Sequence, residues 1–206
     1  MPRRTKSEAE ATRQAILQAA TEVFVAKGVA RASLQEIARS AGVTRGAIYW
    51  HFKNKIDVFK ALHDQLYTSF SERVLADLEL DHPQPLEQLE QLCRAISLEF
   101  VGDSEKNRIL TIFFLRCDYS GDLEAVLARQ KERKAKSVQM LSEYFKRAQA
   151  KGHLKPDANT QVLTLALVSF LTGMIYEQLR NPELFDLTKN ASALIDQFFS
   201  GVGKDR

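Results

Sequence analysis

The segment from Ser33 to Phe52 constrains the fold of this 206-residue chain more than any other. Its first residues, Ser33-Leu34-Gln35-Glu36, have the form of a capping box, in which the serine and glutamate side chains accept hydrogen bonds from each other's backbone amides. Gly42 then permits a tight turn, and Thr44 can cap a second short helix over 45–52. The pattern predicts two short helices joined by a glycine turn.

The rest of the chain is also predicted to be helical, because proline is scarce and no long stretch alternates apolar and polar residues. Besides the two short helices, we expect helices at about 7–27, 54–80, 85–101, 104–117, 123–151, 157–180 and 187–199. The cap of the sixth helix is expected at Asp103 or Ser104. The predicted class is therefore all-α with about nine helices. A three-helix helix-turn-helix head fills residues 1–54, and a helical domain fills residues 55–206.

Charge is distributed unevenly between these two parts. Residues 1–55 hold ten Lys and Arg against four Asp and Glu, a net charge of +6. Residues 56–206 hold 19 Lys and Arg against 22 Asp and Glu, a net charge of −3. A basic head on a mildly acidic body indicates that the head meets a polyanion.

Neither a secretory signal nor a membrane span is expected. The first ten residues are basic and polar, with no apolar region behind them, which favours a cytoplasmic protein. The longest apolar stretch, 162–176, is shorter than the ~20 residues that a bilayer span requires, so we expect a buried helix there. Cys93 and Cys117 lack metal-ligand spacing and are interpreted as small core residues in a reducing compartment, with a redox-sensing pair as the minor alternative.

The third helix has an unusual outward face. If Ala47, Ile48 and Phe52 face the core, then aromatic and basic side chains are left exposed, which is costly unless a partner covers them. Double-stranded DNA suits them, because an arginine at the start of a helix can bind guanine O6 and N7, and hydroxyl, imidazole and ammonium groups suit phosphate oxygens. The predicted DNA-contact residues are Ser33, Thr44, Arg45, Gly46, Tyr49, Trp50, His51 and Lys55. The alternative is a plain helical hairpin with a solvated basic face.

The motif VTRGAIYWHFKNK, residues 43–55, resembles the signature of the TetR/AcrR family of transcriptional regulators. The preceding RRTKSEAEATRQAIL and the segment RILTIFFLRCDYSGDL at 108–123 are similar to the AcrR branch, whose members repress multidrug efflux operons. The resemblance implies a homodimer of nine or ten helices that binds a palindromic operator. It also implies that Arg45, Tyr49, His51 and Lys55 contact DNA.

The predicted eighth helix is apolar on nearly all sides between Val162 and Tyr176, so it needs packing partners on two sides. Its own domain supplies one, and a second subunit can supply the other through a two-fold four-helix interface. The predicted interface residues are Ala166, Phe170, Gly173, Ile195, Phe198 and Phe199. The alternative is a core that lies wholly within one chain.

The family resemblance further implies a cavity for a small lipophilic effector. Its predicted lining residues are Leu66, Phe70, Phe100, Phe113, Phe114, Cys117, Tyr144 and Tyr176. Glu99, Glu143 and Glu177 lie beside apolar positions and could pair with a cationic ligand, although a solvated face or a salt bridge is the favoured interpretation for each.

The predicted function is that of a ligand-responsive repressor of an efflux-pump operon. Two alternatives stay open: a regulator of a metabolic operon, and a helical protein-binding adaptor that never touches DNA. An enzyme is not expected, because the chain shows no Ser/His/Asp order, phosphate loop, HExxH motif or paired carboxylates at a recognisable spacing. Neither a metal ion nor a cofactor is expected.

Overall fold

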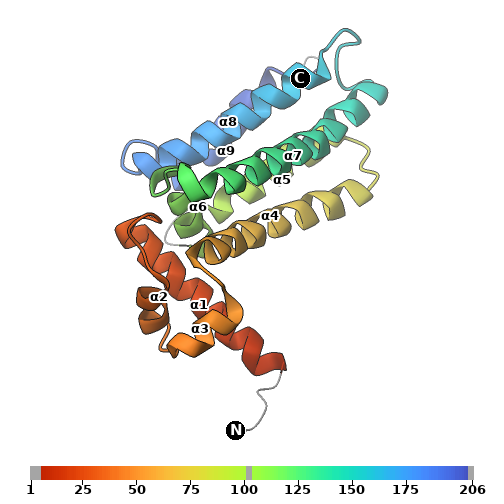
Figure 1. The fold of residues 1–206 in the computed structure, drawn as a ribbon. Helices are drawn as coiled ribbons and strands as arrows, with labels where there is room; N and C mark the ends of the chain where they lie inside the picture. The colour runs from red at the N-terminus through yellow and green to blue at the C-terminus, as the bar shows by residue number, and fades with distance from the viewer. Residues whose placement is uncertain (1–5, 101–103, 204–206) are drawn as a thin grey trace. The chain divides into compact units, whose positions relative to one another are not determined.

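The structure, a computed structural model, describes residues 6–100 and 104–203 (Figure 1). Over these residues it contains α-helices, one short 3-10 turn at Gly121–Leu123 and no strands, which confirms the predicted all-α class. The α-helices are α1 (Lys6–Lys27), α2 (Leu34–Ser40), α3 (Arg45–His51), α4 (Lys55–Glu79), α5 (Pro85–Glu99), α6 (Glu105–Leu115), α7 (Glu124–Ala150), α8 (Thr160–Arg180) and α9 (Leu187–Ser200). All nine lie within a few residues of their predicted positions.

The helix starts follow the predicted caps. The Asn54 side chain accepts a hydrogen bond from the Asp57 amide at 2.9 Å, and Pro85 occupies the first turn of α5. Ser104 caps α6, since its hydroxyl accepts from the Asn107 amide at 3.1 Å. The alternative cap, Asp103, lies outside the described residues.

The chain packs as two compact units. The first comprises residues 1–67 and 108–128, the second residues 68–107 and 129–206, and α4 and α7 each contribute to both. This division differs from the predicted boundary between residues 54 and 55. The reason is that the first turns of α4 and most of α6 supply buried side chains to the same core as the head, among them Phe59, Leu62 and Ile112. A functional boundary at residue 54 stays a prediction.

The core of the first unit gathers apolar side chains from one face of each short helix. Ile16, Phe24, Ile37 and Ile48 are fully buried, and burial of each such side chain contributes roughly 1.5–3 kcal/mol to folding. The Phe24 ring meets the Phe59 ring edge-on, with ring centroids 6.3 Å apart. This core fixes α3 against α1 and α2 through its inward residue Ile48, which leaves the opposite face of α3 outside.

The predicted glycine turn joins α2 to α3. Gly42 has a φ of +64°, a left-handed conformation that costs a side-chain-bearing residue about 1 kcal/mol or more. The Val43 amide donates to the Ala38 carbonyl at 3.0 Å and the Gly42 amide to the Arg39 carbonyl at 3.2 Å, which closes the end of α2 as a Schellman motif. The turn therefore sets the angle at which α3 leaves α2.

Gly28, after α1, has the same backbone conformation with a φ of +78°, but it is crowded. A Cβ at Gly28 would lie 3.3 Å from the Arg116 carbonyl oxygen, whereas a Cβ at Gly42 would meet nothing within 4 Å. We expect Gly42→Ala to lower the free energy of unfolding by about 1 kcal/mol. Gly28→Ala should cost distinctly more. Urea unfolding of both variants measures the difference, and equal losses would show that the approach of Arg116 is unimportant.

The second unit packs α5, α8 and α9 together, and α8 and α9 lie side by side in Figure 1. Its fully buried residues include Leu89, Tyr144, Phe145 and Leu167. Arg94 of α5 ties this helix to α9, because its guanidinium pairs with Asp196 and donates to the Ser192 carbonyl at 3.2 Å. The same guanidinium pairs with Glu90 at 2.6 Å, so this half-buried cation has partners on both helices.

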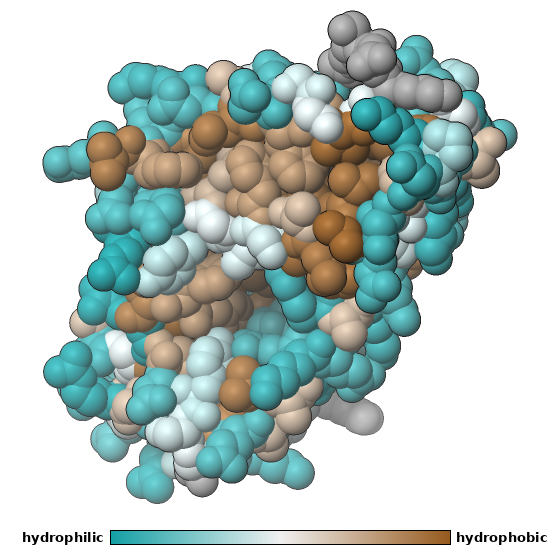
Figure 2. All heavy atoms as spheres, turned by 90° about the horizontal axis from the view of Figure 1, so that it is seen from above, coloured by the Kyte–Doolittle hydropathy of each residue, from teal (hydrophilic) through white to brown (hydrophobic). Residues whose placement is uncertain are grey.

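One face of α8 is not covered within the chain. Val162 is 58% exposed and Leu165 49% exposed, and Ala166, Ser169 and Gly173 continue the same face, whereas Leu167 and Met174 point inward. Figure 2, which views the molecule from above Figure 1, shows apolar surface on the side where α8 lies. The expectation of a buried helix is therefore wrong for the single chain, because side chains of this domain cover only one side of α8.

By length and composition alone, α8 also meets the requirements of a membrane span. It has 21 residues, and its most apolar 18-residue window has a mean hydropathy of 1.5, with 17% of that window buried. The apolar stretch predicted from the sequence, 162–176, is shorter than α8. The helix also includes Thr160 and Gln161 at its start and the mostly polar residues 177–180 at its end.

Candidate nucleic-acid interface

The outward face of α3 carries the predicted aromatic and basic side chains. Tyr49 is 48% exposed and Trp50 is 73% exposed, although both are large and mostly apolar. The Arg45 guanidinium lies over the Tyr49 ring, 5.6 Å from its centroid, and the Trp50 and His51 rings meet edge-on at 4.5 Å. These contacts place the Arg45 and Tyr49 side chains against each other, and the Trp50 and His51 rings against each other, on the exposed face of α3.

The first turn of α3 is capped and exposed. Thr44 caps the helix, with its hydroxyl oxygen accepting from the Ala47 amide at 3.2 Å, and Thr44, Arg45 and Gly46 are all exposed. The absence of a side chain at Gly46 leaves the backbone of this first turn open to close approach.

The capping box at α2 is present as predicted. The Ser33 hydroxyl accepts from the Glu36 amide at 3.2 Å, and the Glu36 carboxylate accepts from the Ser33 amide at 3.1 Å. Glu36 also pairs with Lys27, and the Lys27 ammonium and the Ser33 hydroxyl together lower the pKa of this carboxyl. Ser33 is exposed, so its role in the cap leaves it accessible at the start of α2.

The two lysines of the Lys53-Asn54-Lys55 run differ in the structure, although they look alike in the sequence. The Lys55 ammonium donates to the Ala30 carbonyl at 2.6 Å and to the Ala32 carbonyl at 3.1 Å. Lys53 is exposed. The sequence prediction named Lys55, and not Lys53, as a DNA contact; it stays a prediction, because only the fold shows which lysine reaches backbone carbonyls.

The predicted effector-binding residues fall in both units. Leu66, Phe113, Phe114 and Cys117 belong to the first unit, and Phe70, Phe100, Tyr144 and Tyr176 to the second. A common cavity for them stays a prediction. The Phe113 ring packs edge-on against Phe59 at 5.0 Å and His63 at 5.2 Å, so this residue supports the core of the first unit.

Tyr144 is a structural residue of the second unit. It is fully buried, and its hydroxyl donates to Asp77 Oδ2 at 2.6 Å. Burial, and after it the hydrogen bond with Asp77, raises the pKa of the Tyr144 hydroxyl above its ordinary range. We expect Tyr144→Phe to lower the free energy of unfolding by about 2 kcal/mol, because the Asp77 carboxylate loses a charge-assisted bond. Chemical denaturation measures this loss, and an unchanged midpoint would contradict it.

The three candidate carboxylates already have partners within the chain, and for Glu99 and Glu143 these are the salt bridges that the favoured interpretation allowed. Glu99 pairs with Arg73 and Lys106, and Glu143 pairs with Lys146 at 2.7 Å. Glu177 instead accepts from the Asn181 side-chain amide at 2.8 Å. A cationic ligand would have to compete with these contacts.

Both cysteines are free thiols with raised pKa values. Burial, which is nearly complete, raises the pKa of Cys93 to about 12, and partial burial raises that of Cys117 to about 11. Cys93 is a core residue, as predicted, and neither thiol is activated toward oxidation at neutral pH.

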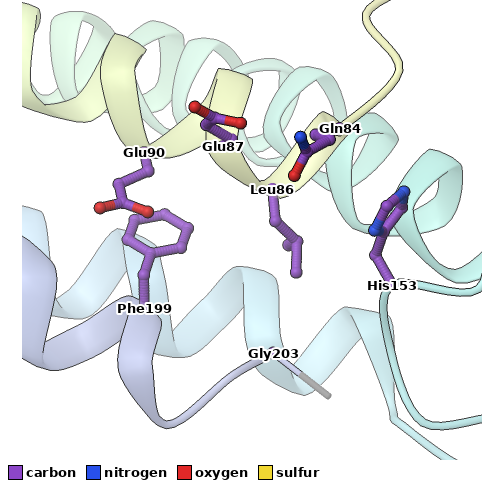
Figure 3. Close-up of a pocket in the computed structure, with 7 residues that line it drawn as sticks. All are labelled: Gln84, Leu86, Glu87, Glu90, His153, Phe199 and Gly203. Carbon is purple, nitrogen blue, oxygen red and sulfur yellow. The ribbon is translucent and has the colours of Figure 1, made fainter. Parts of the chain in front are cut away.

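A cavity of about 200 Å³ opens between α5 and the end of α9 (Figure 3). Its lining residues are Gln84, Leu86, Glu87, Glu90, His153, Phe199 and Gly203, none of which was predicted to bind an effector. Ligand pockets for drug-sized molecules usually measure about 300–1,000 Å³. This hollow is therefore too small for the predicted lipophilic effector.

The predicted dimer residues divide into two groups. Ala166 and Gly173 lie on the exposed face of α8, and the half-buried Phe170 stacks on Phe198 of α9 with centroids 5.1 Å apart. Ile195 and Phe199 are buried in the core of their own chain, with 0% and 4% of their surface exposed. These two predictions need correction, because α9 turns both side chains toward its own unit and leaves them no surface for a partner.

A capped helix-turn-helix with an exposed aromatic and basic second helix, followed by a helical body, defines a DNA-binding regulator. Residues 16–62 match the model of the tetR family of bacterial regulatory proteins, and residues 84–202 match the C-terminal region of MAATS-type transcriptional repressors. The chain belongs to the tetR family of transcriptional regulators.

Relatives cover nearly the whole chain. The HTH-type transcriptional repressor BepR of Brucella suis biovar 1 (strain 1330) is 37% identical over 193 residues, which span 94% of this chain and 92% of BepR. The crystal structure of NalD, the secondary repressor of the MexAB-OprM multidrug efflux pump in Pseudomonas aeruginosa, has a TM-score of 0.83 and 34% identity over 98% of this chain and all of NalD. The complex of SmeT with triclosan has a TM-score of 0.84 and 29% identity, and covers 95% and 93% of the two chains.

Proposed function

We propose that this regulator represses a multidrug efflux operon from the cytoplasm, binding a palindromic operator as a homodimer and leaving it when a lipophilic effector binds. The observation that carries the proposal is the exposed face of α3, where Arg45, Tyr49 and Trp50 lie on a capped helix that packs on the core through Ile48. Arg45 lies in the first turn, the part of a recognition helix that usually contacts base edges in the major groove.

The uncovered face of α8 supports the homodimer. A contiguous stripe of Val162, Leu165, Ala166, Ser169 and Gly173 is apolar or small, and such a surface is rarely left in water on a monomer. A two-fold axis would lay this stripe against its own copy, with the small residues permitting close approach of the helices. A membrane is the weaker alternative for this face, because the chain belongs to a family of DNA-binding regulators.

The effector class is proposed from the relatives and from the composition of the body. NalD and SmeT are repressors of multidrug efflux pumps, and SmeT has been captured with triclosan, a lipophilic phenol. Here the effector would favour a dimer with a different spacing of the two heads and shift the population toward it.

A gel-shift and thermal-shift screen tests the proposal. The probe is a duplex enriched by the wild-type chain from a random-sequence pool, and the compounds include triclosan and a polar sugar as a control. We expect triclosan or a similar lipophilic compound to raise the melting temperature and release the duplex. If the chain binds the duplex but no lipophilic compound releases it, the gating proposal fails while DNA binding stands. Release by a polar metabolite alone would favour a metabolic operon.

A further inference from the structure

The linker Gly28–Ser33 between α1 and α2 is held from several directions. The Val29 amide donates to the Arg116 carbonyl at 3.1 Å, immediately after α6. The Lys55 ammonium, at the start of α4, donates to the carbonyls of Ala30 and Ala32. At its far end, Ser33 begins α2 with the capping box. The linker is therefore hydrogen-bonded both to the start of α4 and to the residue that follows α6, and it ends at the cap of α2.

Lys55 has most of its hydrogen-bonding capacity committed to this linker. An ammonium group has three donors and no acceptor, and two of the three are used at 2.6 and 3.1 Å. Bonds from a charged donor are roughly twice as strong as neutral ones. The side chain is half-buried, whereas Lys53, two residues earlier, is exposed. Binding a phosphate through Lys55 would require breaking or sharing these two bonds.

We propose that Lys55 is a positioning residue that holds the α1–α2 linker on the start of α4, and so fixes α2 and the recognition helix α3, rather than a phosphate contact. This inference rests on the function proposed above, in which α3 contacts the bases of the operator. Because α2 packs on both α1 and α3, a shift of the linker displaces α3 with it. Base contacts demand accurate placement of α3, whereas phosphate contacts provide affinity without sequence information.

Three roles for Lys55 predict different results on DNA. Loss of a phosphate contact weakens binding to every sequence alike and lowers the slope of log K against log salt by about 0.9 for each head. Loss of a purely structural contact lowers the stability of the fold but leaves the folded protein with normal affinity. Loss of a positioning residue weakens binding to the preferred sequence selectively and leaves the salt slope unchanged.

The test compares Lys55→Met with Lys53→Met in the full chain. Both variants remove one positive charge from the same three-residue run, so the diffuse electrostatic effect is matched. Dissociation constants are measured between about 50 and 200 mM salt for the duplex enriched by the wild-type chain and for a scrambled duplex of the same length. Hydrogen exchange of the Val29 and Ser33 amides reports the linker directly.

We expect K55M to lose about tenfold in affinity for the enriched duplex, with little change on the scrambled duplex and an unchanged salt slope. The Val29 and Ser33 amides should exchange faster in K55M and at the wild-type rate in K53M. K53M should keep the wild-type ratio of the two affinities. Should K55M not fold, Lys55→Arg replaces it: the guanidinium keeps the charge but presents its donors in a planar fork in place of a compact ammonium, so the same loss of selectivity is expected.

Equal weakening of both duplexes with a reduced slope in K55M would overturn the proposal in favour of a phosphate contact. Normal affinity of a folded but less stable K55M would overturn it in favour of a structural role. If the wild-type chain enriches no duplex, the DNA-binding proposal itself has failed, and the exchange measurement still decides whether Lys55 holds the linker. Unchanged exchange in K55M would then show that it does not.

Discussion

Replacing Arg45 and Tyr49 with alanine is expected to abolish selective operator binding while the protein stays folded. Both side chains are exposed on α3 and lie outside the buried core, and the Arg45 guanidinium stacks on the Tyr49 ring. A bidentate contact from arginine to guanine is worth about 1–3 kcal/mol, which is about 5- to 150-fold in affinity for each head. Because a dimer has two heads, the loss in affinity applies once for each head.

Gel-shift titration with the enriched duplex measures this loss, and circular dichroism and thermal melting establish the fold. Arg116→Ala is the matched control, because Arg116 is an exposed arginine of the same unit that lies outside the helix-turn-helix. The control should bind as the wild type does. Undiminished binding by the double variant would leave α3 without a role in recognition, whereas a wild-type chain that binds no duplex would favour the adaptor interpretation.

Substituting Ala166 with arginine is expected to split the proposed dimer and weaken operator binding severely. Ala166 lies exposed in the middle of the uncovered face of α8, so a single chain accommodates the larger side chain. Across a two-fold interface, however, two guanidinium groups would meet in an apolar contact, where unpaired charges cost several kcal/mol. Each head would then bind a half-site alone, without the gain in effective concentration that a linked second head provides.

Sedimentation velocity measures the oligomeric state, and Ala135→Arg supplies the control. Ala135 is an exposed alanine of α7, so the same substitution is made at an exposed helical position outside α8. We expect A166R to sediment as a monomer and A135R as the wild type. A dimeric A166R would place the interface elsewhere and leave the apolar face of α8 for another partner.

Local patterns in the sequence predicted the helices and their caps well, because each depends on neighbouring residues only. The capping box of Ser33 and Glu36 is present, and Gly42 closes α2. The inward face of α3 was also predictable, since helical spacing alone places Ile48 and Phe52 on one side.

What the sequence did not reveal depends on contacts between distant residues. Nothing in the chain distinguishes Lys53 from Lys55 until the carbonyls of Ala30 and Ala32 are found beside the second. Ile195 and Phe199 looked suited to a dimer interface because they are large and apolar, but the rotation of α9 points them into their own core. Likewise, the packing of α6 with the head follows from tertiary contacts such as that between Val29 and Arg116.

Hydroxyl-radical footprinting of the enriched duplex, with and without triclosan, tests the central claim most directly. The account predicts two protected half-sites related by two-fold symmetry, with centres one helical turn (about 34–36 Å) apart, because two copies of α3 enter successive major grooves. Both half-sites should lose protection together when triclosan is added. A single asymmetric footprint, or protection spread evenly along the duplex, would contradict a symmetric dimer that reads DNA through α3.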